Sequence, residues 1–199
     1  MGYRKNLLNA IKRDKDHPLN CGIPMQVHHI LSKKGAVNGG VKAILEAYGY
    51  DINALGNLVA LPCTLDGACH LEVQLHRGDH TSFSNDDDDE HPFSYHVHVA
   101  EIMSKAVDFI EKKCEKGSEK RVQNIMNKRS IDVLDDIESF SIRLTRVHKS
   151  FKPQGKGCNG KSNVRELYDS LNLESSNCDR NHKSFSKFPK KKYILKVGR

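Results

Sequence analysis

Histidines are the residues of this chain whose type and spacing point most directly to chemistry. The sequence has 11 histidines, and eight of them lie between His28 and His98. Imidazole nitrogens bind first-row divalent metals and exchange protons near neutral pH, so this concentration favours a metal site with acid–base chemistry. Three features of this region carry the argument: the adjacent pair His28 and His29, the residue Asn57, and the pair His76 and His80.

The spacing of these histidines predicts a metal site with open positions. Adjacent residues on a strand point to opposite faces, so one of His28 and His29 binds a metal while the other approaches a substrate, unless the strand end turns both toward one cleft. His76 and His80 are four residues apart, which places both on one face of a helix. Two ligands from a helix and one from a strand leave room for water and substrate, as in catalytic rather than structural zinc sites.

The elements that must position these residues predict a mixed, mostly helical chain. Short strands are expected at residues 27–31 and 57–61, where apolar residues run together, and a helix is expected at 71–80. Further helices are expected within residues 1–24 and at 41–48, 95–114, 131–147 and 164–171. The Gly- and Lys-rich stretch KPQGKGCNGK, residues 152–161, predicts a flexible linker.

Three stretches in this order resemble the HNH, or ββα-metal, endonucleases, and more closely the AHH branch found among bacterial polymorphic toxins. They are QVHHILSKKG, GYDINALGNLVALP and LHRGDHTSF, and the resemblance covers about residues 20–112. Val27 stands where the family name has Ala. The resemblance implies an α+β, mostly helical fold, in which a ββα-metal core is surrounded by helices and followed by a basic C-terminal extension.

The resemblance also implies roles for single residues. One divalent ion would be held by three ligands: His28, His76 and His80. His29 would be the general base that activates water, and Asn57 would orient His29 by hydrogen bonding across the loop between the two strands. Arg77 would contact a phosphate oxygen. Zinc, nickel, magnesium and manganese are all open as the ion, although three imidazoles favour a first-row transition ion over magnesium.

The charge of the chain is divided unevenly along the sequence. The net charge is +7, but residues 1–112 hold 11 basic and 15 acidic side chains, whereas residues 140–199 hold 15 basic and 4 acidic ones. Such asymmetry is typical of a polyanion-binding arm. We therefore expect duplex DNA to contact the basic tail KKKYILKVGR, at Lys190, Lys191 and Lys192, although the apolar residues of this tail also suit an edge strand.

The motifs and the charge divide the sequence into two parts. We expect a nuclease domain over residues 1–115 and a basic helical extension over residues 116–199. The extension would bind DNA or pack on the nuclease core.

The cysteines and histidines leave a second class of function open. The six cysteines form no C-x2-C pair, so a zinc ribbon is not expected and reduced thiols are the default. A basic nucleic-acid-binding module would close a structural zinc site with a fourth ligand, for instance Cys69 or His70. Cys63 and Cys69 with a nearby His are a further metal-binding option. An RNase with the same fold is the third possibility.

Hydropathy excludes a membrane protein. The mean hydropathy is −0.62, and no run approaches the roughly 20 apolar residues of a membrane span. The N-terminus has no apolar signal region, so we expect synthesis in the bacterial cytoplasm. The resemblance to toxin nucleases implies an antibacterial toxin, delivery into the cytoplasm of a target cell, and a cognate acidic immunity protein.

Overall fold

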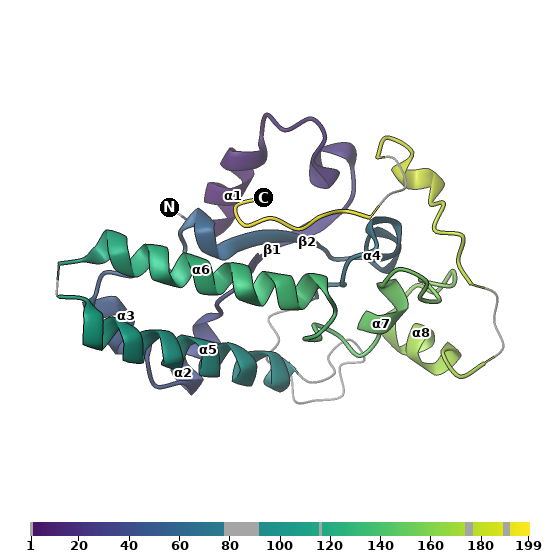
Figure 1. The fold of residues 1–199 in the computed structure, drawn as a ribbon. Coiled ribbons are helices and arrows are strands. Elements are labelled where there is room, and N and C mark those ends of the chain that lie inside the picture. Colours follow the sequence, from purple (N-terminus) through teal and green to yellow (C-terminus); the bar gives the residue numbers. More distant parts are fainter. Residues whose placement is uncertain (1, 78–91, 116, 174–176, 189–191) are drawn as a thin grey trace.

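The computed structural model describes residues 2–77, 92–115, 117–173, 177–188 and 192–199 (Figure 1). This part of the chain is mostly helical and contains a small two-stranded sheet. The strands are β1 (Met25–His29) and β2 (Leu58–Pro62). The α-helices are α1 (Tyr3–Ile11), α2 (Lys33–Asn38), α3 (Lys42–Ala47), α4 (Leu65–Leu71), α5 (Pro92–Lys113), α6 (Glu119–Glu138), α7 (His148–Phe151) and α8 (Val164–Ser170). Short 3-10 helices lie at Pro18–Cys21, Leu55–Asn57 and Lys183–Phe185.

The sheet is small but deeply placed. β1 and β2 pair antiparallel, with His28 opposite Val59 and His29 opposite Leu58. Every residue of β2 is buried. The C-terminal segment, yellow in Figure 1, runs beside β2, where the Ala60 N–H donates to the Arg199 carbonyl at 2.8 Å. The tail therefore covers the edge of β2 that β1 leaves unpaired.

α5 and α6 lie side by side as a long helical hairpin (Figure 1). Their buried residues recur at helical spacing, among them Val99, Met103, Val107 and Ile110 on α5 and Val122, Met126, Val133 and Ile137 on α6. The helix expected at 95–114 is thus confirmed. The helix expected at 131–147 is wrong in its bounds, because α6 ends at Glu138 and the chain turns through Phe140 at a φ of 60°.

The described residues form two separate hydrophobic cores. The main core joins the sheet, the N-terminal half, α5, α6 and four residues of the C-terminal segment, Phe185, Phe188, Tyr193 and Leu195. It therefore extends past residue 115, where the sequence suggested the end of a nuclease domain. The second core is smaller and comprises Leu65, Ala68, Cys69, Leu75, Val147, Phe151, Cys158, Val164 and Leu167. We call the part of the chain around this core, residues 140–173 and 177–182 together with α4, the second lobe.

Two local expectations were wrong. The helix expected at 71–80 is absent over residues 72–77, because α4 ends at Leu71 and Glu72 has a φ of 55°. Residues 78–80 lie outside the described part of the chain. The stretch 152–161, expected to be a flexible linker, is packed in the second lobe, where Cys158 is only 1% exposed.

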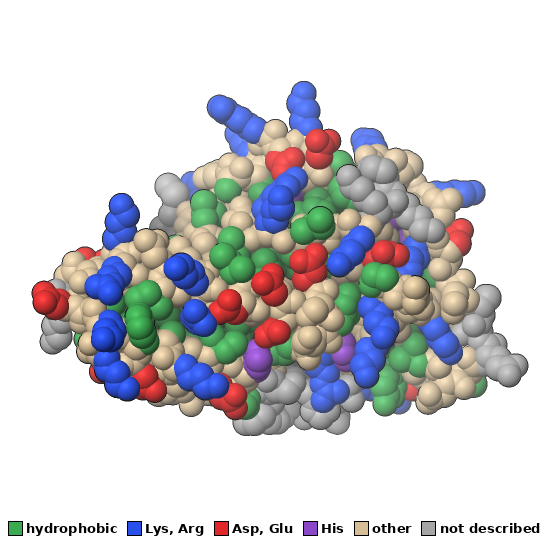
Figure 2. All heavy atoms as spheres, in the orientation of Figure 1, with side chains coloured by type: hydrophobic (Ala, Val, Ile, Leu, Met, Phe, Trp, Pro, Cys, Tyr) green, Lys and Arg blue, Asp and Glu red, His purple; other side chains and the backbone are tan. Residues whose placement is uncertain are grey.

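The charged side chains are mixed on the face drawn in Figure 2. Lys and Arg side chains are most frequent where α5 ends and α6 begins, and Asp and Glu side chains lie among the basic ones over α6 (Figure 2). On this face, the basic residues do not form one continuous patch. In the described ranges, no helix combines the length and the apolar character that crossing a membrane requires.

Candidate active site

The tertiary structure brings two of the three predicted metal ligands together. His28 in β1 and His76 in the segment after α4 are both buried, and the His28 Nδ1 lies 3.0 Å from the His76 Nε2. The His76 N–H donates to the Pro62 carbonyl at 2.9 Å, which holds this segment beside the end of β2. His80, the third predicted ligand, lies outside the described residues.

The hydroxyl of Tyr95, at the start of α5, orients the His28 ring. The hydroxyl donates its proton to the Ile30 carbonyl and lies 2.7 Å from the His28 Nε2. The Nε2 of His28 therefore lies beside Tyr95, and its Nδ1 faces His76.

The side chain of Gln26 fixes the His76 ring in the same way. The Gln26 Oε1 lies 3.2 Å from the His76 Nδ1 and accepts its proton, so the lone pair of His76 is on Nε2. The two buried imidazoles thus meet through ring nitrogens that lie 3.0 Å apart, with the opposite nitrogen of each ring beside Tyr95 or Gln26. This donor pair, with the opposite nitrogen of each ring hydrogen-bonded, fits a divalent metal ion.

His29 has contacts of its own, with Asn53 and Tyr3. The ring is half-buried, its Nε2 lies 3.0 Å from the Asn53 Oδ1, and its centroid lies 4.3 Å from the Tyr3 ring. Burial lowers the pKa of His29, and the Lys33 charge adds to this effect, against opposing contributions from Asn53 and Asp51. A neutral His29 at neutral pH is able to accept a proton.

Asn57 does not contact His29, contrary to expectation. Its Oδ1 accepts from the Leu31 N–H at 2.6 Å, and its Nδ2 donates to the carbonyls of Leu31 at 3.0 Å and Ile52 at 2.9 Å. The reason is geometric: the fully buried amide lies against the backbone that leaves β1 and pairs with both polar groups of Leu31. Asn57 therefore holds the loop, and Asn53 takes the place beside the His29 ring.

Two cationic residues, Arg77 and Lys33, lie close to residues of this site. Arg77 follows His76 directly and is partly exposed. Lys33 lines a hollow of about 310 Å³ together with Asn53, the partner of His29. The tail residues Lys190 and Lys191 lie outside the described part, and Lys192 is 3.9 Å from Glu138.

The fourth ligands considered for a closed histidine site lie elsewhere. The His70 Nε2 is 2.8 Å from the Phe188 carbonyl, and the Cys69 Sγ accepts from the Cys158 N–H at 3.2 Å.

Sequence reasoning missed Tyr95, Gln26 and Asn53. Gln26 had a usable signal, because it lies two residues before His28 on the same face of a strand. Tyr95 is 67 residues away from His28, and no local pattern joins them.

Comparison with known proteins agrees with the motifs. Residues 15–137 match a family described as a nuclease family of the HNH/ENDO VII superfamily with conserved AHH. This range includes β1, β2, α5 and all of α6 but its last residue, and with them His28, His29, Asn57 and His76. Neither the curated proteins nor the solved structures yielded a match. Because the family match spans more than half of the sequence, the chain belongs to the AHH nuclease family of the HNH/ENDO VII superfamily.

Proposed function

We propose that the protein is a metal-dependent endonuclease that hydrolyses DNA with little sequence specificity. Family membership establishes a nuclease. The observation that supports a metal ion is the pair of buried ring nitrogens, His28 Nδ1 and His76 Nε2, which lie 3.0 Å apart, with the candidate base His29 next along the chain.

In this proposal His28 and His76 hold a divalent ion, with His80 as the third ligand. A bound ion would supply positive charge against the negative charge that develops on the phosphate and the leaving oxygen. The chain's own contribution is orientation: Tyr95 and Gln26 hold the ring nitrogens of His28 and His76 that face away from each other.

His29 is the proposed general base. If Asn53 Oδ1 accepts the Nε2–H, the lone pair of His29 is on Nδ1 and is available to a water molecule. The Tyr3 ring packs against the imidazole and restricts its rotation. Lys33 and Arg77 are the proposed phosphate contacts.

DNA is the proposed substrate because of the basic excess in residues 140–199, which suits a polyanion. Lys190, Lys191 and Lys192 remain the proposed contacts of the tail. RNA is the alternative substrate, because the same chemistry cleaves either backbone. The resemblance to toxin nucleases supports three further proposals: an antibacterial role, delivery into a target cell, and an acidic immunity protein that blocks the site.

Cleavage assays test this proposal. Supercoiled plasmid and a structured RNA are incubated with the protein, with added divalent ions or with EDTA. We expect metal-dependent nicking of plasmid. Cleavage of RNA alone would reject the DNA assignment, and cleavage that survives thorough chelation would reject the metal.

His98→Ala is the matched control for variants of the site histidines, because His98 forms a surface pair with Asp136 at 2.9 Å instead. It should retain wild-type cleavage.

A further inference from the structure

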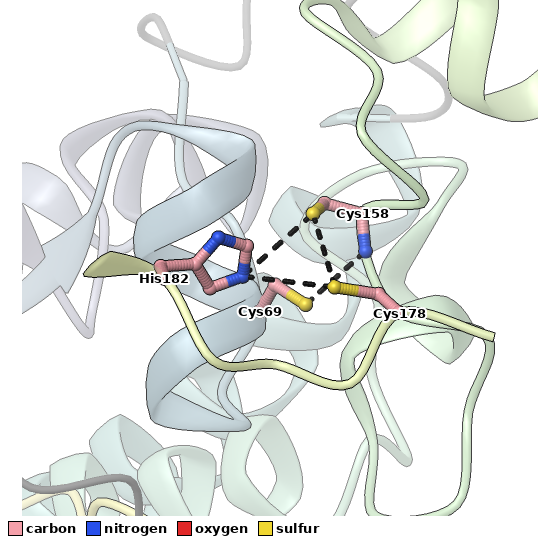
Figure 3. Close-up of side chains that lie close together, drawn as sticks. All are labelled: Cys69, Cys158, Cys178 and His182. Atoms are coloured by element: carbon pink, nitrogen blue, oxygen red, sulfur yellow. Dashed lines mark hydrogen bonds between the residues drawn. The ribbon is translucent and has the colours of Figure 1, made fainter. Parts of the chain in front are cut away.

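A second group of metal-binding side chains lies in the second lobe, away from the histidine pair. Figure 3 shows three cysteines and one histidine pointing at a common centre: Cys69, Cys158, Cys178 and His182. One ligand atom from each lies within 4.8 Å of all the others. Cys69 comes from α4, Cys158 from the loop after α7, and the last two from the segment after α8.

The distances within this group match a tetrahedral metal site. The Cys158 Sγ is 3.7 Å from the Cys178 Sγ and 3.7 Å from the His182 Nε2, and the Cys178 Sγ is 3.8 Å from the same nitrogen. Zinc bonds of about 2.3 Å to sulfur and about 2.0 Å to nitrogen give tetrahedral edges of about 3.8 Å and 3.6 Å. All three cysteines are free thiols, not disulfides.

The surroundings of the group are those of a built site. The backbone N–H of Cys158 donates to the Cys69 Sγ at 3.2 Å, and that of Arg180 donates to the Cys178 Sγ at 3.3 Å. Such bonds stabilise negative charge on sulfur. The His182 Nδ1 lies 3.7 Å from the Asp66 carboxylate, the side of the ring on which metal-binding histidines carry a carboxylate partner.

Gly157 shows how tightly the chain closes around the sulfurs. Its φ is +74°, and an added Cβ would lie 2.7 Å from the Cys178 Cβ and 2.9 Å from the Cys69 Sγ. Only glycine fits this position without displacing a ligand.

A cross-link would stabilise the second lobe. Its core is small, and residues 152–163, which join α7 to α8, contain no helix or strand. Small cores commonly depend on a metal or on disulfides for stability. Buried Arg180 donates to four carbonyls of the 150–155 stretch, at Ser150, Phe151, Lys152 and Gly155, so this region is organised around its polar centre.

We propose that Cys69, Cys158, Cys178 and His182 form a structural zinc site, separate from the nuclease site. Three thiolates and one imidazole complete a tetrahedral shell, so no position is left for water or substrate. The ion joins α4 to the two loops of the second lobe. Because Leu75 belongs to the same core and precedes His76, the zinc site also braces the segment that carries a candidate catalytic ligand.

Cobalt substitution of the full-length protein tests the proposal directly. Purified protein is stripped of metal under reducing conditions and titrated with Co²⁺. We expect thiolate-to-cobalt charge-transfer bands, with the visible spectrum of a tetrahedral ion, and displacement of both by Zn²⁺. Absence of any sulfur–cobalt band in folded protein would overturn the proposal.

Single-residue variants test whether the sulfur–cobalt bands come from this cluster. Cys158→Ser should remove or strongly weaken the sulfur–cobalt bands, whereas Cys114→Ser, a buried cysteine of the main core, should leave them unchanged. His182→Cys should keep a bound ion and shift the bands toward those of four thiolates, so the test does not depend on a variant that fails to fold.

The reactivity of the thiols distinguishes a zinc site from a disulfide between Cys158 and Cys178. In zinc-loaded protein, the cluster thiols should react slowly with a maleimide and quickly after chelation. A disulfide between Cys158 and Cys178 in freshly purified protein, formed equally well in the presence of zinc, would overturn the proposal.

Discussion

The two candidate metal-binding regions differ in what their ligands leave open. At the first, two imidazole nitrogens 3.0 Å apart lie beside a third histidine and near a lysine-lined hollow. At the second, four ligand atoms surround one centre. An incomplete shell next to a base suits catalysis, whereas a complete shell suits structure. We infer from this difference that the chain uses metal at two separate places, for catalysis at the first and for stability at the second.

The two regions are also supported differently. His28 and His76 are held by strand pairing and by side chains of the main core, so their geometry does not require a metal. The cysteine cluster lies among short helices and loops around a small core. We therefore expect metal removal to abolish activity at the first site and to lower stability at the second.

The largest effect should come from His76→Ala. We expect cleavage to fall to background, because a partial shell of imidazoles loses affinity when one ligand is deleted. Cleavage assays and metal analysis measure both losses. The sulfur–cobalt bands of the second lobe should remain in this variant, and their disappearance would show that the two sites are not independent.

His29→Ala should separate catalysis from metal binding at the first site. We expect the cleavage rate to fall by about 100- to 10,000-fold, the usual contribution of a general base, with the metal content unchanged. Single-turnover cleavage and plasma emission analysis provide the two values. Wild-type nicking by this variant would remove His29 from the mechanism.

Variants of Asn57 and Asn53 should distinguish a residue that stabilises the fold from one that positions the candidate base. Asn57→Ala leaves buried polar groups of Leu31 unpaired, so we expect a loss of about 2 kcal/mol or more in the free energy of unfolding. Asn53→Ala should lower the cleavage rate about 10-fold with little change in stability, since it only positions His29. Denaturant unfolding and kinetics are both needed, and the reverse pattern would contradict the assignments.

Replacing the tail lysines should change DNA affinity but neither metal site. We expect Lys190→Gln, Lys191→Gln and Lys192→Gln together to reduce the slope of log affinity against log salt by about 2 to 3. Substitution is preferable to truncation, because Tyr193 and Leu195 are buried in the main core. An unchanged slope, measured by fluorescence anisotropy, would leave the tail a purely structural role.

The smallest effect concerns a histidine with no metal-binding role. His17 is fully buried and accepts from the Leu19 N–H, and burial lowers its pKa from 6.5 to about 4. Between these values the unfolded chain binds one more proton, so stability falls as the pH is lowered through this range, by at most about 1.4 kcal/mol per pH unit.

His17→Asn, which keeps a capping acceptor, should flatten this dependence in metal-free protein. Urea unfolding at several pH values measures it. The pH dependence of stability that His17 causes must be subtracted from the measured curves before the loss of metal in acid is compared between the two sites. An unaltered profile in the variant would assign the proton to another group.

Local sequence determined the features of this protein that depend on neighbours along the chain. The run at residues 27–31 predicted β1, although the strand begins and ends two residues earlier; the apolar run after Asn57 predicted β2, and helical periodicity predicted most of α5. The three motifs in order identified the AHH nuclease family. These signals are readable because strand and helix periods repeat over only a few residues.

Tertiary structure alone decided which side chains meet. His76 reaches His28 from an extended segment and not from a helix, and Tyr95 completes that contact from α5. The cysteine cluster joins Cys69 to Cys158 across 89 positions, without the short spacing that marks a zinc motif. Contacts of this kind depend on how the cores bring distant segments together, and residue spacing carries no record of that packing.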